Sequence, residues 1–195
     1  PHSMSWTLDD LITITFTLFA IIDILGSIPL LITLKNKMGG IAEGKATLVS
    51  GALMILFLFT GEKLLGILGL DVKSFAVAGS IVIFILGLEM VLGVEFFKSD
   101  ANAPSGSVVP IAFPLIAGSG TLTTIISLNA NYGKTPILLA ILINLVFVFM
   151  VLKSLNYIAR LLRPAGLLAV RKFFGVILLA IAVKIFILNV GGLIK

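Results

Sequence analysis

Long apolar runs separated by short polar stretches occupy most of the chain. Because a hydrocarbon core about 30 Å thick needs about 20 helical residues, six runs are long enough to cross a membrane. They cover residues 8–34, 41–70, 72–96, 108–130, 136–161 and 167–194. Backbone groups cannot remain unpaired in lipid, so each run is expected to be mainly helical. The pattern predicts an all-α membrane protein with six transmembrane helices.

Composition supports this class and argues against several others. Hydrophobic residues make up 59% of the chain and charged residues only 12%, against about 25% charged in soluble domains. There is no Cys, which excludes disulfides and thiolate metal sites. Residues 1–3, which precede Met4, are typical of an expression remnant, and without His2 the chain has no imidazole for metal binding or proton transfer. We therefore expect no metal and no cofactor.

Basic residues are distributed unevenly between the two sets of loops. One side carries Lys35, Lys37, Lys45, Lys98, Lys153, Arg160, Arg163, Arg171 and Lys172, and the other carries Lys63, Lys73, Lys134 and Lys195. The positive-inside rule makes the first side cytoplasmic and, with six spans, places both termini outside. This distribution accounts for the net charge of +5, so nucleic acid is not an expected partner. The first run follows two acidic residues and is interpreted as a true span rather than a signal peptide.

Two pairs of runs resemble each other at nearly the same spacing. Residues 24–29 align with 116–121 at an offset of 92 (118 − 26), and residues 80–89 align with 175–184 at an offset of 95 (175 − 80). Two copies of three spans must have opposite orientations, because three is odd. The chain is therefore predicted to form one membrane domain of two inverted repeats, residues 4–98 and 108–195, as in many secondary transporters.

Helix-weakening residues occur at equivalent positions in the first and fourth runs. Gly26 and Pro29 flank a serine in the first run, and a Gly-Ser-Gly sequence with Pro110 and Pro114 upstream occurs in the fourth. Single glycines and serines in membrane helices often serve only close packing. A pair of breaks in a repeat instead predicts broken helices that line a polar cavity. The predicted substrate site comprises Gly26, Ser27, Gly118, Ser119, Gly120, Thr121 and Thr123.

Three ionisable residues lie within the apolar runs: Asp23, Glu89 and Lys184. A charge at the bilayer centre costs about 2.5–3.5 kcal/mol on insertion scales, so each should face protein, water or a partner. Counting from the ends of the runs places Asp23 and Lys184 near mid-depth and Glu89 nearer the cytoplasmic side. This favours an Asp23–Lys184 ion pair, with Glu89 as the alternative partner, and all three are candidates for coupling or gating. The basic cluster at 160–172 is interpreted as a topology and headgroup anchor.

These motifs resemble those of the MarC family of six-span bacterial and archaeal membrane proteins, over essentially the whole chain. Asp23-Ile24-Leu25-Gly26-Ser27-Ile28-Pro29 resembles the family pattern Asp-Pro-x-Gly-Asn-x-Pro. Pro114-Leu115-Ile116-Ala117-Gly118-Ser119-Gly120-Thr121 resembles Pro-Leu-x-x-Gly-Pro-Gly-Thr, the more specific of the two. Ile24 and Ser119 replace prolines, Ser27 replaces an asparagine, and family members often have Gln where Glu89 and Lys184 stand. The resemblance implies a transporter of small neutral amino acids such as glycine and alanine.

The sequence thus predicts a secondary transporter in a bacterial or archaeal cytoplasmic membrane, moving a small zwitterion by alternating access with proton or sodium coupling. One alternative is a channel or a carrier of an ion or lipid phosphate. An intramembrane enzyme would need Ser27 or Ser119 with Lys184 as a Ser-Lys dyad, and enzymatic activity is not expected. A non-transporting scaffold is the third alternative. Membrane lipid and a second copy of the chain are the other expected partners.

Overall fold

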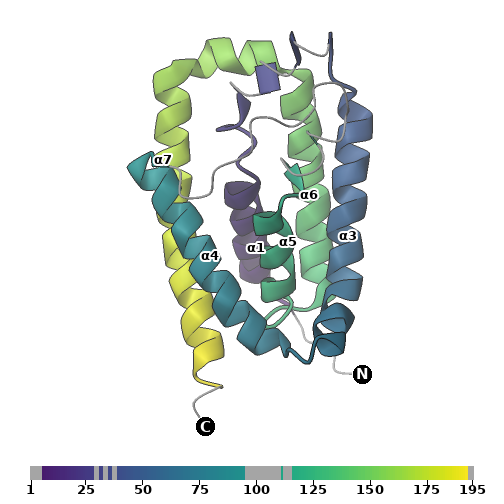
Figure 1. The fold of residues 1–195 in the computed structure, drawn as a ribbon. Coiled ribbons are helices and arrows are strands. Elements are labelled where there is room, and N and C mark those ends of the chain that lie inside the picture. The colour runs from purple at the N-terminus through teal and green to yellow at the C-terminus, as the bar shows by residue number, and fades with distance from the viewer. Residues whose placement is uncertain are drawn as a thin grey trace.

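A computed structural model describes residues 6–28, 31–32, 35–36, 39–94, 111 and 116–192 (Figure 1). Six helices and no strand occur in these residues. The helices are α1 (Leu8–Ile22), α3 (Glu43–Ile67), α4 (Val72–Leu92), α5 (Ser119–Leu128), α6 (Lys134–Lys153) and α7 (Leu155–Val190). The predicted all-helical class is confirmed.

Four of these helices are long and apolar enough to cross a membrane: α3, α4, α6 and α7. The other two are shorter than the hydrocarbon core. α1 has 15 residues and α5 has 10, which correspond to about 22 Å and 15 Å of helix. They lie in the first and fourth predicted runs, the two in which breaks are expected. Six complete spans and the inverted repeat stay predictions.

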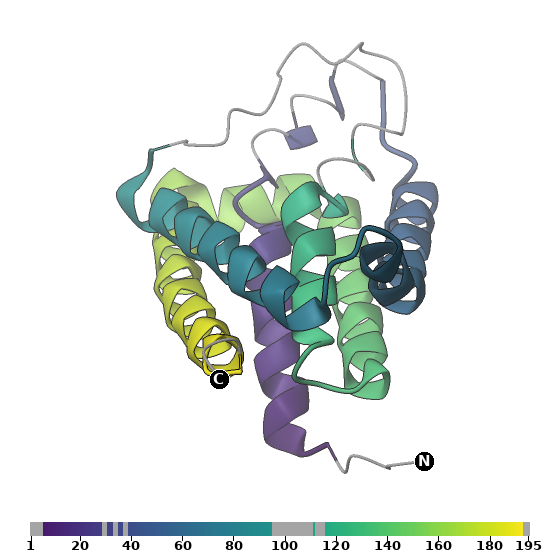
Figure 2. The ribbon, with the colours of Figure 1, turned by 60° about the horizontal axis from the view of Figure 1, so that its bottom comes forward.

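The short helices lie in the middle of the bundle. α4 and α7 pack against each other on one side, α3 and α6 pack on the other, and α1 and α5 lie between the two pairs (Figures 1 and 2). α5 contacts α1, α3 and α4. A Cβ on Gly61 of α3 would lie 2.6 Å from Ile126 Cγ1 of α5, and one on Gly79 of α4 would overlap Ser127 Oγ. Glycines on the long helices therefore make room for α5.

α4 and α7 cross where two glycines face each other. A Cβ on Gly87 would lie 3.1 Å from the carbonyl oxygen of Gly175, and a Cβ on Gly175 would lie 3.1 Å from that of Gly87. Lys73 at the start of α4 reaches Gly192 beyond the end of α7, so the two helices are antiparallel. Close backbone approach is the established use of small residues in membrane helices.

The boundary between the fifth and sixth predicted runs differs from expectation. The fifth predicted run extends to residue 161, but α6 already ends at Lys153 and the next helix begins at Leu155. Arg163 then interrupts α7 with φ 55° and ψ 169°. Proline disfavours helical geometry in the residue before it and lacks an N–H, which explains this break. The residues before the break lie across the upper end of the bundle, and the rest of α7 descends beside α4 (Figure 1).

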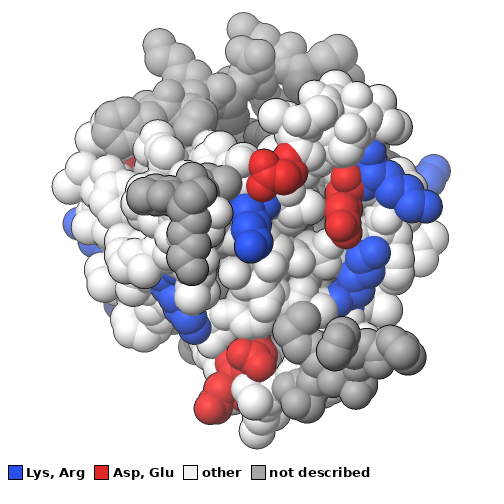
Figure 3. Space-filling view, turned by 90° about the horizontal axis from the view of Figure 1, so that it is seen from below, with Lys and Arg blue, Asp and Glu red and all other residues white. Residues whose placement is uncertain are grey.

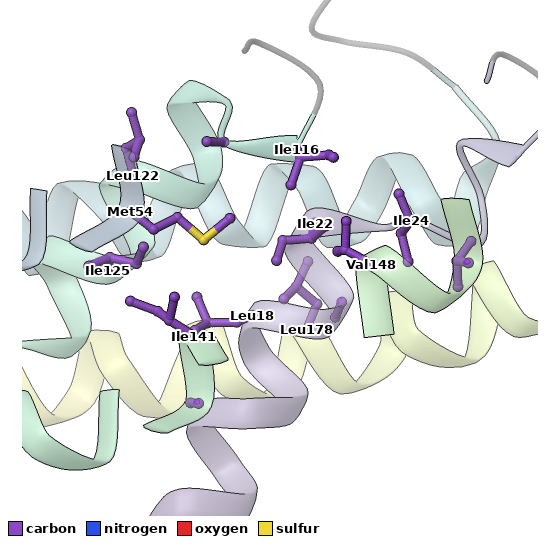
Figure 4. Close-up of a cluster of buried hydrophobic side chains, with 14 of the residues drawn as sticks. Leu18, Ile22, Ile24, Met54, Ile116, Leu122, Ile125, Ile141, Val148 and Leu178 are labelled. Carbon is purple, nitrogen blue, oxygen red and sulfur yellow. The ribbon is translucent and has the colours of Figure 1, made fainter. Parts of the chain in front are cut away.

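Buried aliphatic side chains fill the space between the helices at the level of the breaks. Ile22, Ile24 and Ile116 are at most 4% exposed and lie near Val148 of α6 and Leu178 of α7 (Figure 4). Both predicted break regions therefore face protein interior rather than lipid on at least one side.

Charged side chains gather at the ends of the bundle. The lower end presents acidic and basic side chains together (Figure 3). It includes the end of α3 with Glu62 and Lys63 and the start of α4 with Asp71 and Lys73. At the two ends of α6, Lys134 lies 5.7 Å from the ring centre of Phe59 and Lys153 lies 5.4 Å from that of Phe149. Such terminal lysines extend along apolar surface toward water.

Candidate functional site

The helix of the first run ends at Asp23. α1 stops at Ile22, and Asp23 has φ 47° and ψ 44°, a left-handed conformation that Asp tolerates better than most residues. The Asp23 N–H still donates to Phe19 O (3.1 Å), and the Asp23 carbonyl accepts the N–H of Ser27 (3.0 Å). Helical hydrogen bonding therefore restarts at Asp23. The predicted interruption is present, and it is centred on the acidic residue.

Two contacts hold the Asp23 carboxylate. Gly26 N–H donates to Oδ1 at 3.3 Å, and Arg171 Nε lies 3.4 Å from Oδ2. These contacts are needed because a carboxylate at the C-terminal end of a helix opposes the helix dipole. A Cβ on Gly26 would lie 2.5 Å from both carboxylate oxygens. Because Gly26 has no side chain, the Asp23 carboxylate can occupy this space.

Arg171 reaches Asp23 from the descending part of α7. One turn further along α7, the Phe174 ring lies 4.9 Å from that of Phe19 and 6.1 Å from that of Phe16, both on α1. The side chains of Arg171 and Asp23 are 34% and 22% exposed. Arg171 Nε itself is buried and makes no hydrogen bond with the described residues. The pair is therefore a partly desolvated charge contact without well-formed hydrogen bonds.

A cavity of about 310 Å³ opens beside this ion pair. Its described lining is apolar except for Gly26 and the guanidinium of Arg171; the other lining residues are Ile28, Ile32, Ala159, Pro164, Leu167 and Leu168. Ligand sites usually measure about 300–1,000 Å³, with apolar walls and a few fixed polar groups. This cavity lies at the small end of that range, so it suits a small ligand with charged or polar groups at one end.

The second break precedes α5 and is built differently. Gly118 is the N-cap of α5 and gives no side-chain hydrogen bond, while its carbonyl accepts the N–H of Leu122 (3.0 Å). The buried Thr121 hydroxyl donates to Ile116 O at 3.0 Å. A Cβ on Gly120 would lie 3.0 Å from Leu86 Cδ1 of α4 and 3.8 Å from Ile21 Cγ2 of α1. The two breaks are thus close neighbours.

Among the predicted substrate-binding residues, Gly26 lines the cavity, and the others for which the structure gives side-chain contacts face elsewhere. The Ser27 hydroxyl donates to the carbonyl of Asp23 (2.9 Å). Thr123 Cγ2 would lie 3.2 Å from a Cβ on Gly79 of α4. Gly118, Gly120 and Thr121 are not among the described lining residues of the cavity. Pro29, Pro110, Pro114 and the Ser119 side chain lie outside the described residues.

The predicted Asp23–Lys184 ion pair is wrong. Asp23 lies against Arg171, whereas Lys184 is exposed and its charge acts on Asp10 at the start of α1. Asp10 and Asp23 are separated by about 20 Å of helix. Counting depth from Lys172 fails because α7 already begins its descent after Arg163, so Lys184 lies further down the bundle than the count implies. Glu89, the other candidate, is buried on α4.

Arg171 is the site residue that the sequence interpretation missed, because it was grouped with the cytoplasmic anchor at 160–172. A periodic signal was available. Leu167, Leu178, Ala182, Ile185 and Asn189 are buried at spacings of three, four and eleven residues, and Arg171 falls on the same stripe between the first two. A helical stripe that faces the bundle interior predicts an inward position for each residue on it.

Comparison with known proteins identifies the family. A sequence model described as MarC family integral membrane protein matches residues 8–194. This chain belongs to the MarC family. It is 29% identical over 185 residues to a UPF0056 membrane protein of Pyrococcus abyssi, covering 90% of this chain and 91% of that one. It is 27% identical over 189 residues to the UPF0056 inner membrane protein YhgN of Escherichia coli, covering 92% and 95%.

A third relative has the same extent of similarity. The UPF0056 membrane protein BU449 of Buchnera aphidicola is 27% identical over 185 residues, covering 91% of this chain and 94% of that protein. None of these three names states a substrate. No solved structure matches the chain. The family assignment agrees with the resemblance noted in the motifs and establishes an integral membrane protein.

Proposed function

We propose that this MarC-family chain is a secondary transporter that moves small neutral amino acids across the cytoplasmic membrane by alternating access. The cavity of about 310 Å³ beside the Asp23–Arg171 pair carries the proposal. Its volume suits a small ligand, and the lining residue Arg171 with its neighbour Asp23 supplies charges of both signs next to it. A zwitterion with a short apolar side chain complements both features.

The packing of the helices supports two inverted halves. Exchanging the first three predicted runs for the last three exchanges α1 with α5, α3 with α6 and α4 with α7. Under this exchange, the α1–α6 contact becomes α5–α3, and the α1–α7 contact becomes α5–α4; all four contacts are present. The members of each exchanged pair also run in opposite directions (Figure 1). This is the arrangement expected if one half rocks against the other around a central site.

The distribution of charge supports the proposed orientation. α3 begins and α6 ends at the upper end of the bundle, where the first part of α7 also lies (Figure 1). Basic residues predominate in these segments, which contain Lys45, Lys153, Arg160 and Arg163 against Glu43. Under the positive-inside rule the upper end is cytoplasmic and both termini are external.

Asp23 is the residue proposed to couple transport to a proton or sodium ion.

The alternatives receive less support from the described residues. A crevice of about 230 Å³ between α4 and α7 would suit a lipid chain, but its described lining, which includes Ile81, Phe84 and Phe186, holds no cation for a phosphate. The Ser-Lys dyad would require Lys184 to reach Ser27, which lies beside Asp23 and Arg171, whereas Lys184 is 13 residues (184 − 171), about 20 Å of helix, beyond Arg171 on α7. A filled scaffold does not account for a cavity lined by an arginine.

Counterflow in proteoliposomes tests the proposal. Vesicles are loaded with unlabelled alanine, labelled alanine is added outside, and transient accumulation is followed for wild type, Asp23→Asn and the exposed-site control Arg160→Gln. We expect accumulation with wild type and the control. Asp23→Asn should lose uptake driven by a pH or sodium gradient, and its exchange should be slower than that of wild type. Asn keeps the left-handed backbone accessible, so the variant tests the charge.

The outcome that contradicts the proposal is defined by wild type. If folded wild-type protein shows no counterflow with alanine, glycine or serine, the amino-acid assignment fails for this chain. The same vesicles would then be assayed for flux of ions and of lipid phosphates, the remaining transport classes.

A further inference from the structure

Arg171 lines the cavity beside the first break, and its ion-pair partner Asp23 contacts Gly26, another lining residue. Together the two side chains supply both charges that a zwitterion needs. Resting on the proposed function, we infer that the Asp23–Arg171 pair is a clamp that opens to insert the zwitterion. The ammonium of the substrate binds the carboxylate of Asp23, and its carboxylate binds the guanidinium of Arg171. The pair of opposite charges at 3.4 Å is thus the closed, substrate-free form of the site.

The two partners differ in how firmly they are held. Asp23 is fixed by its left-handed backbone and by the Gly26 N–H, and its side chain is the more buried of the two. Arg171 has a long side chain that lines the cavity, and its Nε makes no hydrogen bond with the described residues. Opening the clamp therefore requires Arg171 to rotate toward the cavity while Asp23 stays in place.

Insertion of a zwitterion preserves electrical balance. The closed pair has no net charge, and the open pair with an inserted zwitterion also has none. A carboxylate-only or amine-only ligand would leave one protein charge without its partner in a partly desolvated site, which is unfavourable. The clamp therefore selects zwitterions over simple anions and cations of the same size.

The rest of the cavity selects the side chain of the substrate. Ile28, Ile32 and Leu167 form apolar walls next to Arg171. These walls accept a hydrogen or methyl group and offer no partner to a charged side chain, whose burial without one is costly. The inferred ligand class is α-amino acids with small uncharged side chains.

Ligand-dependent thermal stabilisation of the purified protein tests the clamp without requiring transport. The probes are alanine, propionate and ethylamine at equal concentrations, with wild type, Arg171→Gln, Arg171→Lys and the control Arg160→Gln. Arg160 is a suitable control because it lies on the same helix, is exposed, and donates to its own helix at Asn156 O. Size-exclusion profiles establish that each variant is folded.

We expect alanine to stabilise wild type and Arg160→Gln, and the two single-charge ligands to have little effect. Arg171→Gln should weaken alanine binding about tenfold or more, since charge-assisted hydrogen bonds are roughly twice as strong as neutral ones. Arg171→Lys, which keeps the charge but not the planar fork, should give an intermediate loss.

Two results would overturn the clamp. One is that folded Arg171→Gln binds alanine with an affinity within about twofold of wild type. Such a change is well below the expected tenfold loss, which corresponds to about 1.4 kcal/mol. The other is equal stabilisation by propionate and alanine. Neither result would contradict wild-type counterflow of alanine, so failure of the clamp is distinguishable from failure of the proposed function.

Discussion

The two helix breaks lie side by side but differ in chemistry. At the first, a left-handed aspartate ends α1, carries a charge into the bundle and meets an arginine at the edge of a cavity. At the second, a glycine begins α5, a threonine hydroxyl satisfies a nearby carbonyl, and aliphatic side chains surround the turn. The first break has the features of a binding site. The second has those of a packed structural turn.

This difference shows that sequence equivalence does not imply equal function. Gly26 and Gly118 align in the repeat, and both belong to interruptions of a membrane helix. Only the first interruption has a charge beside it, because Asp23 aligns with Leu115 at the offset of 92. A broken helix in a membrane is tolerated when it lines a cavity or when protein buries it, and this chain uses both solutions.

The largest contrast is expected from alanine substitutions at one glycine of each break region, Gly26 and Gly120. In Gly26→Ala the new Cβ would lie 2.5 Å from both Asp23 carboxylate oxygens, so the carboxylate must leave its position by Arg171. We expect a loss of about 1–3 kcal/mol of stability, typical of overpacking, and loss of most alanine exchange. In Gly120→Ala the Cβ meets the flexible tip of Leu86 at 3.0 Å, and exchange should be retained.

Thermal unfolding in detergent and proteoliposome counterflow measure these effects. Gly66→Ala serves as the reference for a glycine in open space, because nothing lies within 4 Å of its Cβ position. It should raise stability by about 0.5–1 kcal/mol through helix propensity alone. Exchange at the wild-type rate in Gly26→Ala would show that the position of the Asp23 carboxylate is not needed.

A smaller effect is expected when the polar contact of the second break is removed. Thr121→Val keeps the shape of the side chain and deletes the hydroxyl that donates to Ile116 O at 3.0 Å. We expect a loss of about 1 kcal/mol, since the buried carbonyl loses this donor, with alanine exchange largely unchanged. If exchange is lost while the variant remains folded, the second break also binds substrate, and the contrast between the two breaks disappears.

The helical class, the family and the approximate place of both breaks could be predicted from the sequence, because they depend on apolar run length and on local residues such as Asp23, Gly26 and Gly118. The ion pair could not. Lys184 and Arg171 lie on the same apolar run, and the choice between them depends on where α7 turns at Arg163, which sets the register of α7 against α1. Register between helices is a tertiary property that hydropathy does not determine.

The turn in α7 provides a comparison between two residues with positive φ, Asp23 and Arg163. Asp23 has φ and ψ both near 45°, where a short polar side chain is tolerated, whereas Arg163 combines φ 55° with ψ 169°, a region that favours glycine. Arg163→Gly should therefore raise stability by about 1 kcal/mol, or roughly 2–4 °C in melting temperature. Arg163→Ala should give no such gain, because alanine also has a Cβ. Equal melting temperatures for the glycine and alanine variants would show that backbone strain at this turn is negligible.

The smallest effect is expected from a substitution at Asp71. This residue serves as a control for the charge at Asp23. Asp71 is the N-cap of α4, outside the membrane-spanning segment, and hydrogen bonds from the Ser74 side chain and N–H lower the pKa of its carboxyl. A lowered pKa means that its stabilising contribution is present above the ordinary value and is lost as the pH falls through the lowered one. Asp71→Asn keeps a good N-cap, so it should remove this weak pH dependence in melting experiments and leave alanine exchange intact.

Asp71→Asn and Asp23→Asn make the same chemical change at opposite ends of two helices. A carboxylate at the start of α4 complements the helix dipole, whereas one at the end of α1 opposes it and relies on Arg171. If position 23 served only to end the helix, an uncharged residue would be more favourable there. The carboxylate of Asp23 is present although the dipole of α1 disfavours it. If the two variants have the same transport phenotype, Asp23 acts only as a helix terminator. If gradient-driven uptake fails in Asp23→Asn alone, the charge at the first break serves transport.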